Sequence, residues 1–397
     1  MIIGLVGKPS SGKSTFFKAT TLAEVEIANY PFTTIEKNEG VGFVKVKCAD
    51  KEFNVRCNPR FGYCLNGIRF IPVQLIDVAG LVPEAHLGKG RGLAFLNDLN
   101  QADALIHIVD ASGSLDAEGN PVESGSYDPA NDIRFLEIEL DHWYLSILKK
   151  GWEKFARKIR QEHGSMIKAL GEQLGGLKVN EKMVEETVNK LKLPEDFMLW
   201  DDSHLLQLST ELRKRTKPMV IACNKIDCPG AEERFSRLKK EFPDLLLVPC
   251  SGIAELMLKE AARDGIIEYI PGEGDFKMLQ EEKLSEKQKK GFAFIREMLG
   301  KFHSTGVQDV LNIAVFELLG CIAIFPGGVN KLEDKDGNIL PDCFILPRNT
   351  TALDFAFHIH TDLGKNFVKA IDVRRKLPVG KDHLLKHRDV IEIKTSK

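Results

Sequence analysis

Short apolar runs that end at glycine or at polar turns recur along much of the chain. They are almost continuously hydrophobic rather than alternating, and helical patterns separate them. Such runs are typical of strands that are buried on both faces of a parallel sheet. The pattern therefore predicts a doubly wound α/β fold with a mainly parallel sheet. The expected strands lie within residues 1–7, 70–79, 104–111, 218–225 and 245–252.

Two stretches depart from this rhythm within the sheet region. Residues 112–130 are polar and rich in glycine, serine and proline, which predicts a loop that leaves the sheet. Apolar residues then recur at helical spacing from Ile133 to Ile147, and further helical patterns follow. We therefore predict an inserted helical domain over 131–205. It would separate the two parts of the sheet domain, 1–130 and 206–305.

The composition changes again near Leu318, after a helical pattern over 306–317. From there the chain has short β-type runs, turn signals at DKDGN and LPVGKD, and one helical stretch. These signals predict a connecting helix over 306–317 and a small α+β domain over 318–397.

Composition narrows the classes of function. The 397 residues include 55 Lys and Arg against 57 Asp and Glu, so any basic surface has to be local. No apolar run approaches the roughly 18 residues that are needed to cross a bilayer, and no secretory apolar segment opens the sequence. We expect a cytoplasmic protein with reduced cysteines and no membrane partner.

The strongest chemical signal is GKPSSGKS, residues 7–14, which lies between a predicted strand and a predicted helix. It matches the phosphate-binding pattern G-x-x-x-x-G-K-[ST]. Its two glycines would let the backbone wrap a phosphate, Lys13 would reach the β- and γ-phosphates, and Ser14 would bind Mg²⁺. The predicted nucleotide contacts are Gly7, Lys8, Pro9, Ser10, Ser11, Gly12, Lys13, Ser14 and Thr15.

Two later motifs distinguish between kinds of P-loop protein. In DVAG, Asp77 ends a predicted strand and would hold Mg²⁺, while the Gly80 amide would contact a γ-phosphate. In NKID, the Asp227 carboxylate can accept two hydrogen bonds from the N1 and N2 donors of guanine, which adenine does not offer. Further base contacts are predicted at Asn224, Lys225, Ser251 and Gly252.

The segment before DVAG carries the candidates for a nucleotide switch. Thr33 and Thr34 offer a hydroxyl that could reach Mg²⁺ only when the γ-phosphate is present. After DVAG, Leu81 stands where Ras-like hydrolases usually carry a glutamine that orients the attacking water. We therefore expect slow hydrolysis unless His86, Lys89, Arg91 or an activating protein supplies this function. The predicted catalytic residues are Lys13, Thr34, Gly80 and His86.

Three stretches together resemble the OBG group of translation-factor-related GTPases, and within it the YchF-like branch. They are YPFTTIEKNEG at 30–40, LIDVAGLVPEAHLGKGRGLAFLNDLNQADALIHIVD at 75–110, and NKID at 224–227. The resemblance implies that Thr34 rather than Thr33 is the switch ligand to Mg²⁺. It also implies that 318–397 is a TGS domain of β-grasp type and that the partner is a ribosome or structured RNA.

Two residues depart from the pattern of that branch. YchF proteins characteristically have a glutamate at the end of NKxD and prefer ATP, whereas Asp227 here favours GTP and GDP. Many relatives carry a P-loop asparagine, linked to potassium-assisted hydrolysis, where this chain has Ser10. Ser10 therefore argues against potassium stimulation.

Two further clusters have alternative interpretations. Cys48, Cys57 and Cys64 lack the short C-x₂₋₄-C spacing of zinc ribbons, and no histidine lies between them. We expect free cysteines there rather than zinc. The basic stretches 149–160 and 373–376 are compatible with RNA contact, although a solvated helix face also explains the first.

The sequence thus predicts a GTPase that acts as a nucleotide switch with GTP or GDP and Mg²⁺, on ribosomes or RNA in translation. Two alternatives remain open. One is an ATPase of YchF type, and the other is an RNA-binding adaptor whose nucleotide site is only structural.

Overall fold

The computed structural model describes residues 1–22, 38–78 and 98–396, and these form two compact units. The first unit comprises Met1–Phe17 and Leu75–Gly252, and the second comprises Lys18–Gln74 and Ile253–Lys397. The predicted bounds group residues 18–74 with the sheet domain, whereas this division groups them with the C-terminal half. Within the described residues, no helix is long and apolar enough to cross a membrane.

A parallel sheet organises the first unit. Its strands β1 (Ile2–Val6), β5 (Ala104–Asp110), β6 (Met219–Asn224) and β7 (Leu246–Pro249) are neighbours in that order. Every residue of β5 and β6 is buried, which explains why both strands are mostly apolar. At the other side of β1, the Val78 amide donates to the Leu5 carbonyl at 3.1 Å, so the end of β4 (Ile68–Asp77) lies beside β1. The predicted doubly wound sheet is confirmed.

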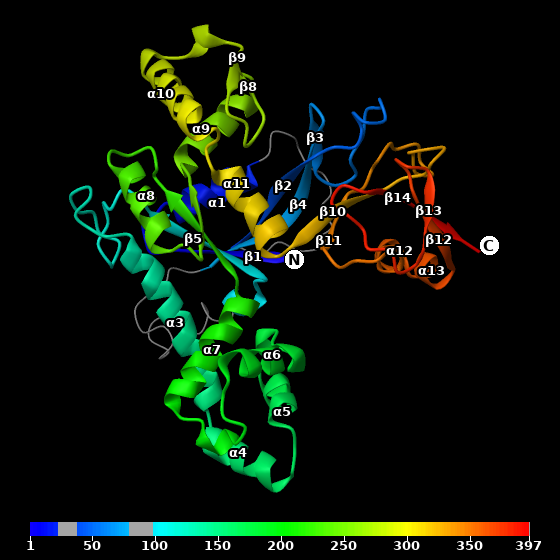
Figure 1. Ribbon diagram of the computed structural model, residues 1–397. Helices are drawn as coiled ribbons and strands as arrows, with labels where there is room; N and C mark the ends of the chain where they lie inside the picture. The colour runs from blue at the N-terminus through cyan, green and yellow to red at the C-terminus, as the bar shows by residue number, and fades with distance from the viewer. Residues whose placement is uncertain (23–37, 79–97, 397) are drawn as a thin grey trace. The chain divides into compact units, whose positions relative to one another are not determined.

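The inserted helices form an arm that begins and ends with two packed helices, α3 (Ala130–Lys149) and α7 (Asp202–Thr216) (Figure 1). The Tyr144 hydroxyl lies 2.7 Å from the Thr216 hydroxyl across this pair. The predicted end of the insertion at 205 falls inside α7, which continues for three turns. In the chain, α3 and α7 are separated by α4 (Trp152–Gln161), α5 (Met166–Gln173), η2 (Gly175–Leu177), α6 (Glu181–Leu191) and η3 (Phe197–Leu199).

The N-terminal part of the second unit is built on β2 (Glu39–Lys47) and the hairpin of β3 (Tyr63–Leu65) with β4. Phe43, Tyr63 and Phe70 fill its core, with the Tyr63 and Phe70 rings stacked at 4.5 Å. The chain later returns to this unit through a helical region and a two-stranded sheet. These elements are α9 (Gly252–Arg263), β8 (Ile267–Tyr269), β9 (Phe276–Met278), η4 (Glu281–Lys283), α10 (Glu286–Phe302), α11 (Val307–Asn312) and the π-helix η5 (Ile313–Leu318).

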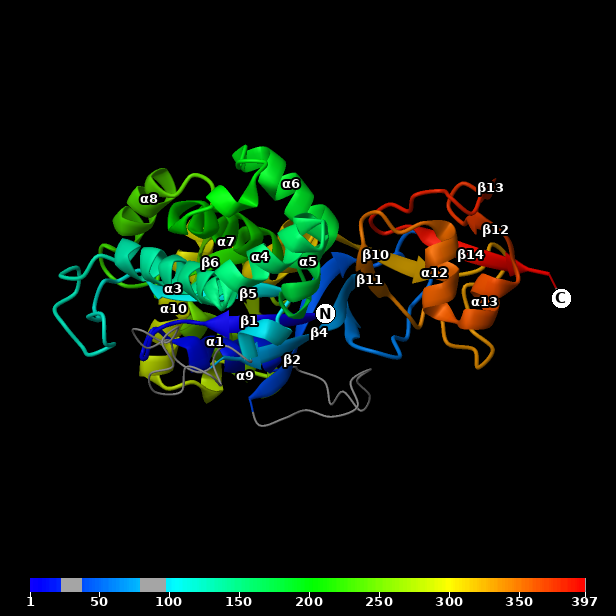
Figure 2. The same cartoon turned by 90° about the horizontal axis from the view of Figure 1, so that it is seen from below.

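The C-terminal sheet has the strand order β11-β10-β14-β12-β13, in which β10 and β14 are parallel and the other pairs are antiparallel. The first and last strands of the module are thus central neighbours, as in a β-grasp fold. Figure 2 shows α12 and α13 beside this sheet, and Phe355 of α12 packs against Ile324 and Ile391. The elements are β10 (Cys321–Pro326), β11 (Phe344–Pro347), α12 (Ala352–Ile359), α13 (Thr361–Lys365), β12 (Phe367–Asp372), β13 (Leu377–Val379) and β14 (Val390–Thr395).

The remaining helices of the first unit follow strands of the parallel sheet. Helix α1 (Lys13–Thr21) begins directly after the glycine-rich loop that leaves β1, and α8 (Ala231–Glu241) follows β6. Since parallel strands end at the same edge of a sheet, the loops after β1, β4, β5 and β6 all emerge at one edge. This edge carries the residues that the sequence selects for nucleotide binding.

Candidate functional site

The loop between β1 and α1 has glycine where only glycine fits. A Cβ atom on Gly7 would lie 2.6 Å from the Ile108 carbonyl oxygen. Gly12 has φ of +94°, and a Cβ there would overlap the side-chain amide of Asn224. Pro9, Ser10 and Ser14 are exposed at the outer side of the loop. The backbone is therefore packed too closely for a side chain at either glycine, which fits the tight turn of a phosphate-binding loop.

The polar segment after β5 braces this loop through Lys8. The Lys8 ammonium lies 2.9 Å from a carboxylate oxygen of Asp132 in α3 and 3.1 Å from the Leu115 carbonyl oxygen. It also sits 3.9 Å from the centre of the Tyr127 ring. The sequence predicts Lys8 as a nucleotide contact, but its ammonium group forms this buried ion pair with Asp132 instead. Its backbone alone is left to face a phosphate.

Lys13 and Asp77 come from two different elements and form an ion pair. Lys13 opens α1, Asp77 ends β4, and both side chains are largely buried. Ser14 follows Lys13 at the exposed start of the helix. A carboxylate and a hydroxyl are the oxygen donors that Mg²⁺ takes from proteins at phosphate sites. The residues fit such an ion, and an incoming phosphate would compete with Asp77 for the Lys13 ammonium.

Asn224 joins the P-loop to the loop after β7. Its side-chain nitrogen donates to the Ser11 carbonyl at 3.0 Å, and its side-chain oxygen accepts from the Gly252 amide at 2.9 Å. The Asn224 side chain is buried, and these two hydrogen bonds give its nitrogen and its oxygen the protein partners that buried polar atoms need. An aspartate at this position could accept from Gly252 but could not donate to Ser11. The geometry thus fixes Ser251 and Gly252 next to the P-loop.

Lys225 is held by a residue that the sequence interpretation did not select. Its ammonium lies 3.0 Å from a carboxylate oxygen of Asp110, which faces Asn224 across the β5–β6 ladder. Burial disfavours the charged form of Asp110, but hydrogen bonds from Ser112 and Lys225 outweigh burial and lower its pKa. Asp110 is the last residue of a mostly apolar strand, at the edge where the other site residues lie, and that position could have revealed it.

Asp227 differs from these neighbours because one of its oxygens has no partner. Its Oδ1 atom is shielded from solvent and finds no hydrogen-bond donor among the described residues. A buried carboxylate oxygen normally has a donor, because leaving it unpaired costs free energy. The arrangement points to a donor that a bound molecule would bring.

The predicted switch and catalytic residues outside the P-loop cannot be placed. Thr34, Gly80 and His86 all lie outside the described residues. The same holds for Thr33, Leu81, Lys89 and Arg91. Their roles stay predictions from the sequence.

The parallel sheet, the glycine loop before α1 and the loops at Asp77 and Asn224–Asp227 define the chain as a P-loop nucleotide-binding protein. Residues 2–136 match the family model described as 50S ribosome-binding GTPase. Residues 222–328 match Obg-like GTPase YGR210-like, G4 motif-containing domain, and residues 334–395 match the TGS domain.

Similar individual proteins are also named as GTP-binding proteins or Obg-like proteins. The chain is 48% identical over 393 residues to an uncharacterized GTP-binding protein of Methanocaldococcus jannaschii, covering 99% of this chain and 98% of that one. A crystal structure of a GTP-binding protein from Pyrococcus horikoshii OT3 is 40% identical, with a TM-score of 0.79 and full coverage of both chains. Obg-like ATPase 1 of Rattus norvegicus is 29% identical over 331 residues, 78% of this chain and 74% of that protein. The chain belongs to the same family as these GTP-binding proteins, with an Obg-like GTPase region and a C-terminal TGS domain.

Proposed function

We propose that this GTP-binding protein is a guanine-selective switch whose base specificity comes from Asp227. The observation that carries the proposal is the buried Asp227 oxygen without a donor. Guanine presents two adjacent N–H donors to a carboxylate, while adenine presents one amino group and an acceptor nitrogen at the same edge. A site built to receive both donors discriminates strongly against a base that lacks them.

The surrounding residues supply the rest of the binding site. The backbone of residues 7–14 cradles the phosphates, and Lys13 exchanges its Asp77 contact for phosphate oxygens. Ser14 and Asp77 are the described residues that would hold Mg²⁺, and the bound ion would neutralise phosphate charge. Asn224 keeps the P-loop and the Ser251–Gly252 loop in register through its two hydrogen bonds.

Competition binding tests the role of Asp227. With a fluorescent guanine nucleotide bound, GTP should displace the label at concentrations at least about tenfold below those of ATP, because adenine leaves the carboxylate unpaired. The Asp227→Glu variant should lose most of this preference, since the longer side chain moves the carboxylate from its place.

The matched control is Asp244→Glu, the same change at an exposed position beyond α8. It should keep the preference of the parent chain. Equal displacement by ATP and GTP in the parent protein would overturn the proposal and favour an ATPase, the activity named for the rat relative.

The proposed switch hydrolyses GTP slowly by itself. Leu81 has no group that can hydrogen-bond a water, and phosphoryl transfer depends on positioning and on stabilising charge. A partner that positions the water or adds a charge would then set the hydrolysis rate. This proposal explains how such a chain can sense GTP and yet persist in the GTP-bound form until it meets its target.

The proposed target is a ribosomal particle or another structured RNA. The description of the matched model, 50S ribosome-binding GTPase, supports this choice. So does α4, in which Lys154, Arg157, Lys158 and Arg160 are all exposed. In the second predicted basic cluster, Arg374 is half-buried against Glu52 and the Arg388 carbonyl, and two exposed cations remain, Arg375 and Lys376. Helix α4 thus offers four exposed cations against two. The arm is therefore the better candidate for RNA contact.

A further inference from the structure

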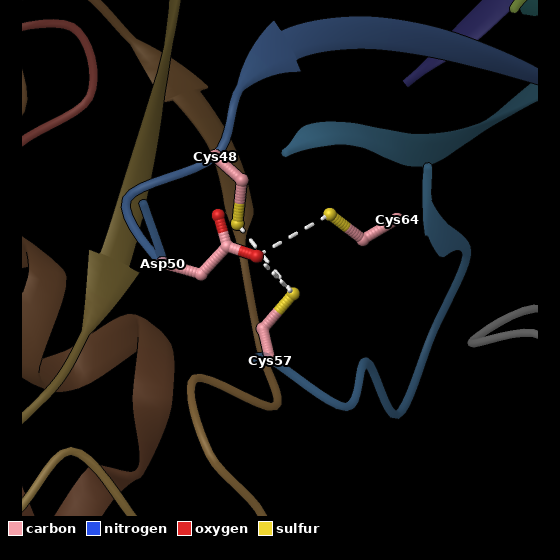
Figure 3. Close-up of side chains that lie close together, drawn as sticks. All are labelled: Cys48, Asp50, Cys57 and Cys64. Carbon is pink, nitrogen blue, oxygen red and sulfur yellow. Dashed lines mark hydrogen bonds between the residues drawn. The ribbon is translucent and has the colours of Figure 1, made fainter. Parts of the chain in front are cut away.

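Three cysteines from three successive segments of the chain converge in the second unit, together with one carboxylate (Figure 3). Cys48 follows β2, Cys57 lies in the loop before β3, and Cys64 belongs to β3. The ligand atoms of the four residues all lie within 4.8 Å of one another. We call this group the thiol cluster, and its members are Cys48, Asp50, Cys57 and Cys64.

The spacing within the thiol cluster matches a tetrahedral metal site. With Zn–S bonds of about 2.3 Å and a Zn–O bond of about 2.0 Å, a tetrahedron has S···S edges of about 3.8 Å and S···O edges of about 3.5 Å. The sulfurs of Cys48 and Cys57 are 3.6 Å apart. The Asp50 Oδ2 atom lies 3.3 Å from the Cys57 sulfur and 3.8 Å from the Cys64 sulfur.

The cluster is buried and its carboxylate is oriented by the backbone. Cys48, Asp50 and Cys57 are each at most 8% exposed. The Lys51 amide donates to the Oδ1 atom of Asp50 at 2.7 Å, which leaves Oδ2 directed at the sulfurs. Figure 3 shows the four side chains pointing toward a common centre. A hydrogen bond from the backbone to the other oxygen of a carboxylate is what orients such a ligand toward a metal.

A buried cation stands beside the cluster. The Arg69 side chain is fully buried, and its guanidinium lies 3.9 Å from the Cys48 sulfur. The same group donates to the Leu340 carbonyl at 2.6 Å, which fixes its position. Three thiolates and one carboxylate around a divalent ion leave an excess of negative charge. A neighbouring arginine offsets part of that charge, as buried charges require.

We propose that the thiol cluster binds one Zn²⁺ ion as a closed structural site. Thiolate ligands in tetrahedral geometry select zinc among the common divalent ions. Because four protein ligands leave no open position, the ion would stabilise structure rather than take part in a reaction. The spacing of the cysteines in the sequence does not show this site, because it takes no account of the β3–β4 hairpin. The turn of that hairpin lies beside Cys48, whose amide donates to the Gly67 carbonyl.

The site would fix the loop that contacts the start of the C-terminal module. Between the ligands Cys57 and Cys64, the Asn58 amide donates to the Ile339 carbonyl at 3.0 Å and the Arg60 amide donates to the Pro341 carbonyl at 2.9 Å. Zinc would thus hold residues 48–64 in the conformation that makes these contacts. This inference does not depend on nucleotide binding, because no member of the cluster belongs to the P-loop unit.

Metal analysis of the full-length chain tests the site. Protein purified without chelators should contain about one zinc per chain. After exchange, Co²⁺ should give the strong visible and sulfur charge-transfer bands of a tetrahedral thiolate complex. Cys57→Ser should lose the zinc and these bands, and Asp50→Asn should bind zinc at least about tenfold more weakly.

Cys321→Ser, a thiol change in β10 of the same unit, is the matched control and should keep the zinc. If Cys57→Ser does not fold, the parent protein still provides a test. A chelator should lower its thermal midpoint, and added Zn²⁺ should restore the midpoint. A parent chain that binds neither Zn²⁺ nor Co²⁺, or a Cys321→Ser variant that loses its metal equally, would overturn the proposal.

Discussion

Lys8 shows how a residue inside the phosphate-binding loop can serve the loop rather than the ligand. Its side chain and that of Asp132 are each 8% exposed, and the two are 124 positions apart in the chain. A buried ion pair adds little net stability over an apolar pair, but the loss of one partner leaves an unpaired buried charge. The pair therefore makes the conformation of the P-loop sensitive to α3.

Replacing one partner of this pair should destabilise the protein strongly. Lys8→Met is expected to lower the free energy of unfolding by about 3–5 kcal/mol, because Asp132 stays buried without its cation. Adding Asp132→Leu should recover most of this loss. Urea unfolding followed by circular dichroism measures both changes.

Lys149→Met is the control for this experiment, since Lys149 pairs with Asp202 at the surface. It should change the free energy of unfolding by no more than about 1 kcal/mol. If Lys8→Met has an equally small effect, the buried pair does not support the loop.

At the scale of elements, α4 is the helix of the inserted arm that we propose to contact RNA. Trp152 at its start stacks on Trp200 with ring centres 5.9 Å apart, which anchors the helix at one end. Its basic side chains point outward, and several pair with exposed carboxylates, such as Arg157 with Glu153. Exposed pairs of this kind are weak and exchange readily. The same cations are therefore available to phosphate groups.

Charge reversal on this part of the arm should weaken RNA binding. The variant Lys150→Glu/Lys154→Glu is expected to bind ribosomal RNA more weakly and to reduce the slope of log affinity against log salt by about one to two. Both side chains are exposed, so the fold should persist. Filter binding over a series of salt concentrations provides the measurement.

Lys239→Glu/Lys240→Glu makes the same change in charge at exposed positions of another helix, α8. A loss of affinity as large as that of the arm variant would show that only net charge matters. In that case α4 is a solvated face and not an RNA contact.

At the scale of the whole molecule, the sequence predicted the features that depend on local patterns, but it did not predict contacts between residues that are far apart in the chain. The parallel sheet and the loop at 7–14 follow from periodicity and spacing, which depend on neighbouring residues. The pairing of Lys8 with Asp132 and the convergence of Cys48 with Cys64 depend on how the chain folds back. The residues that flank these positions in the sequence do not indicate either contact.

The grouping of residues 18–74 with the C-terminal half was also beyond the sequence. It rests on contacts such as those of Arg69 with the Leu340 carbonyl and of Arg388 with the Lys47 carbonyl. The residues of each pair are separated by hundreds of positions, and the type of a single charged residue does not indicate which residue it will contact. The predicted bounds followed periodicity and composition, which change after residue 111 and again near Leu318.

We propose that bound nucleotide decides whether this protein engages its target. The decisive experiment is cosedimentation with ribosomal particles of the full-length chain, which is loaded either with a non-hydrolysable GTP analogue or with GDP. We expect an affinity at least about fivefold higher for the GTP-analogue form, which is the usual lower range of coupling between two sites. Equal cosedimentation in the two states, or none in either, would contradict it.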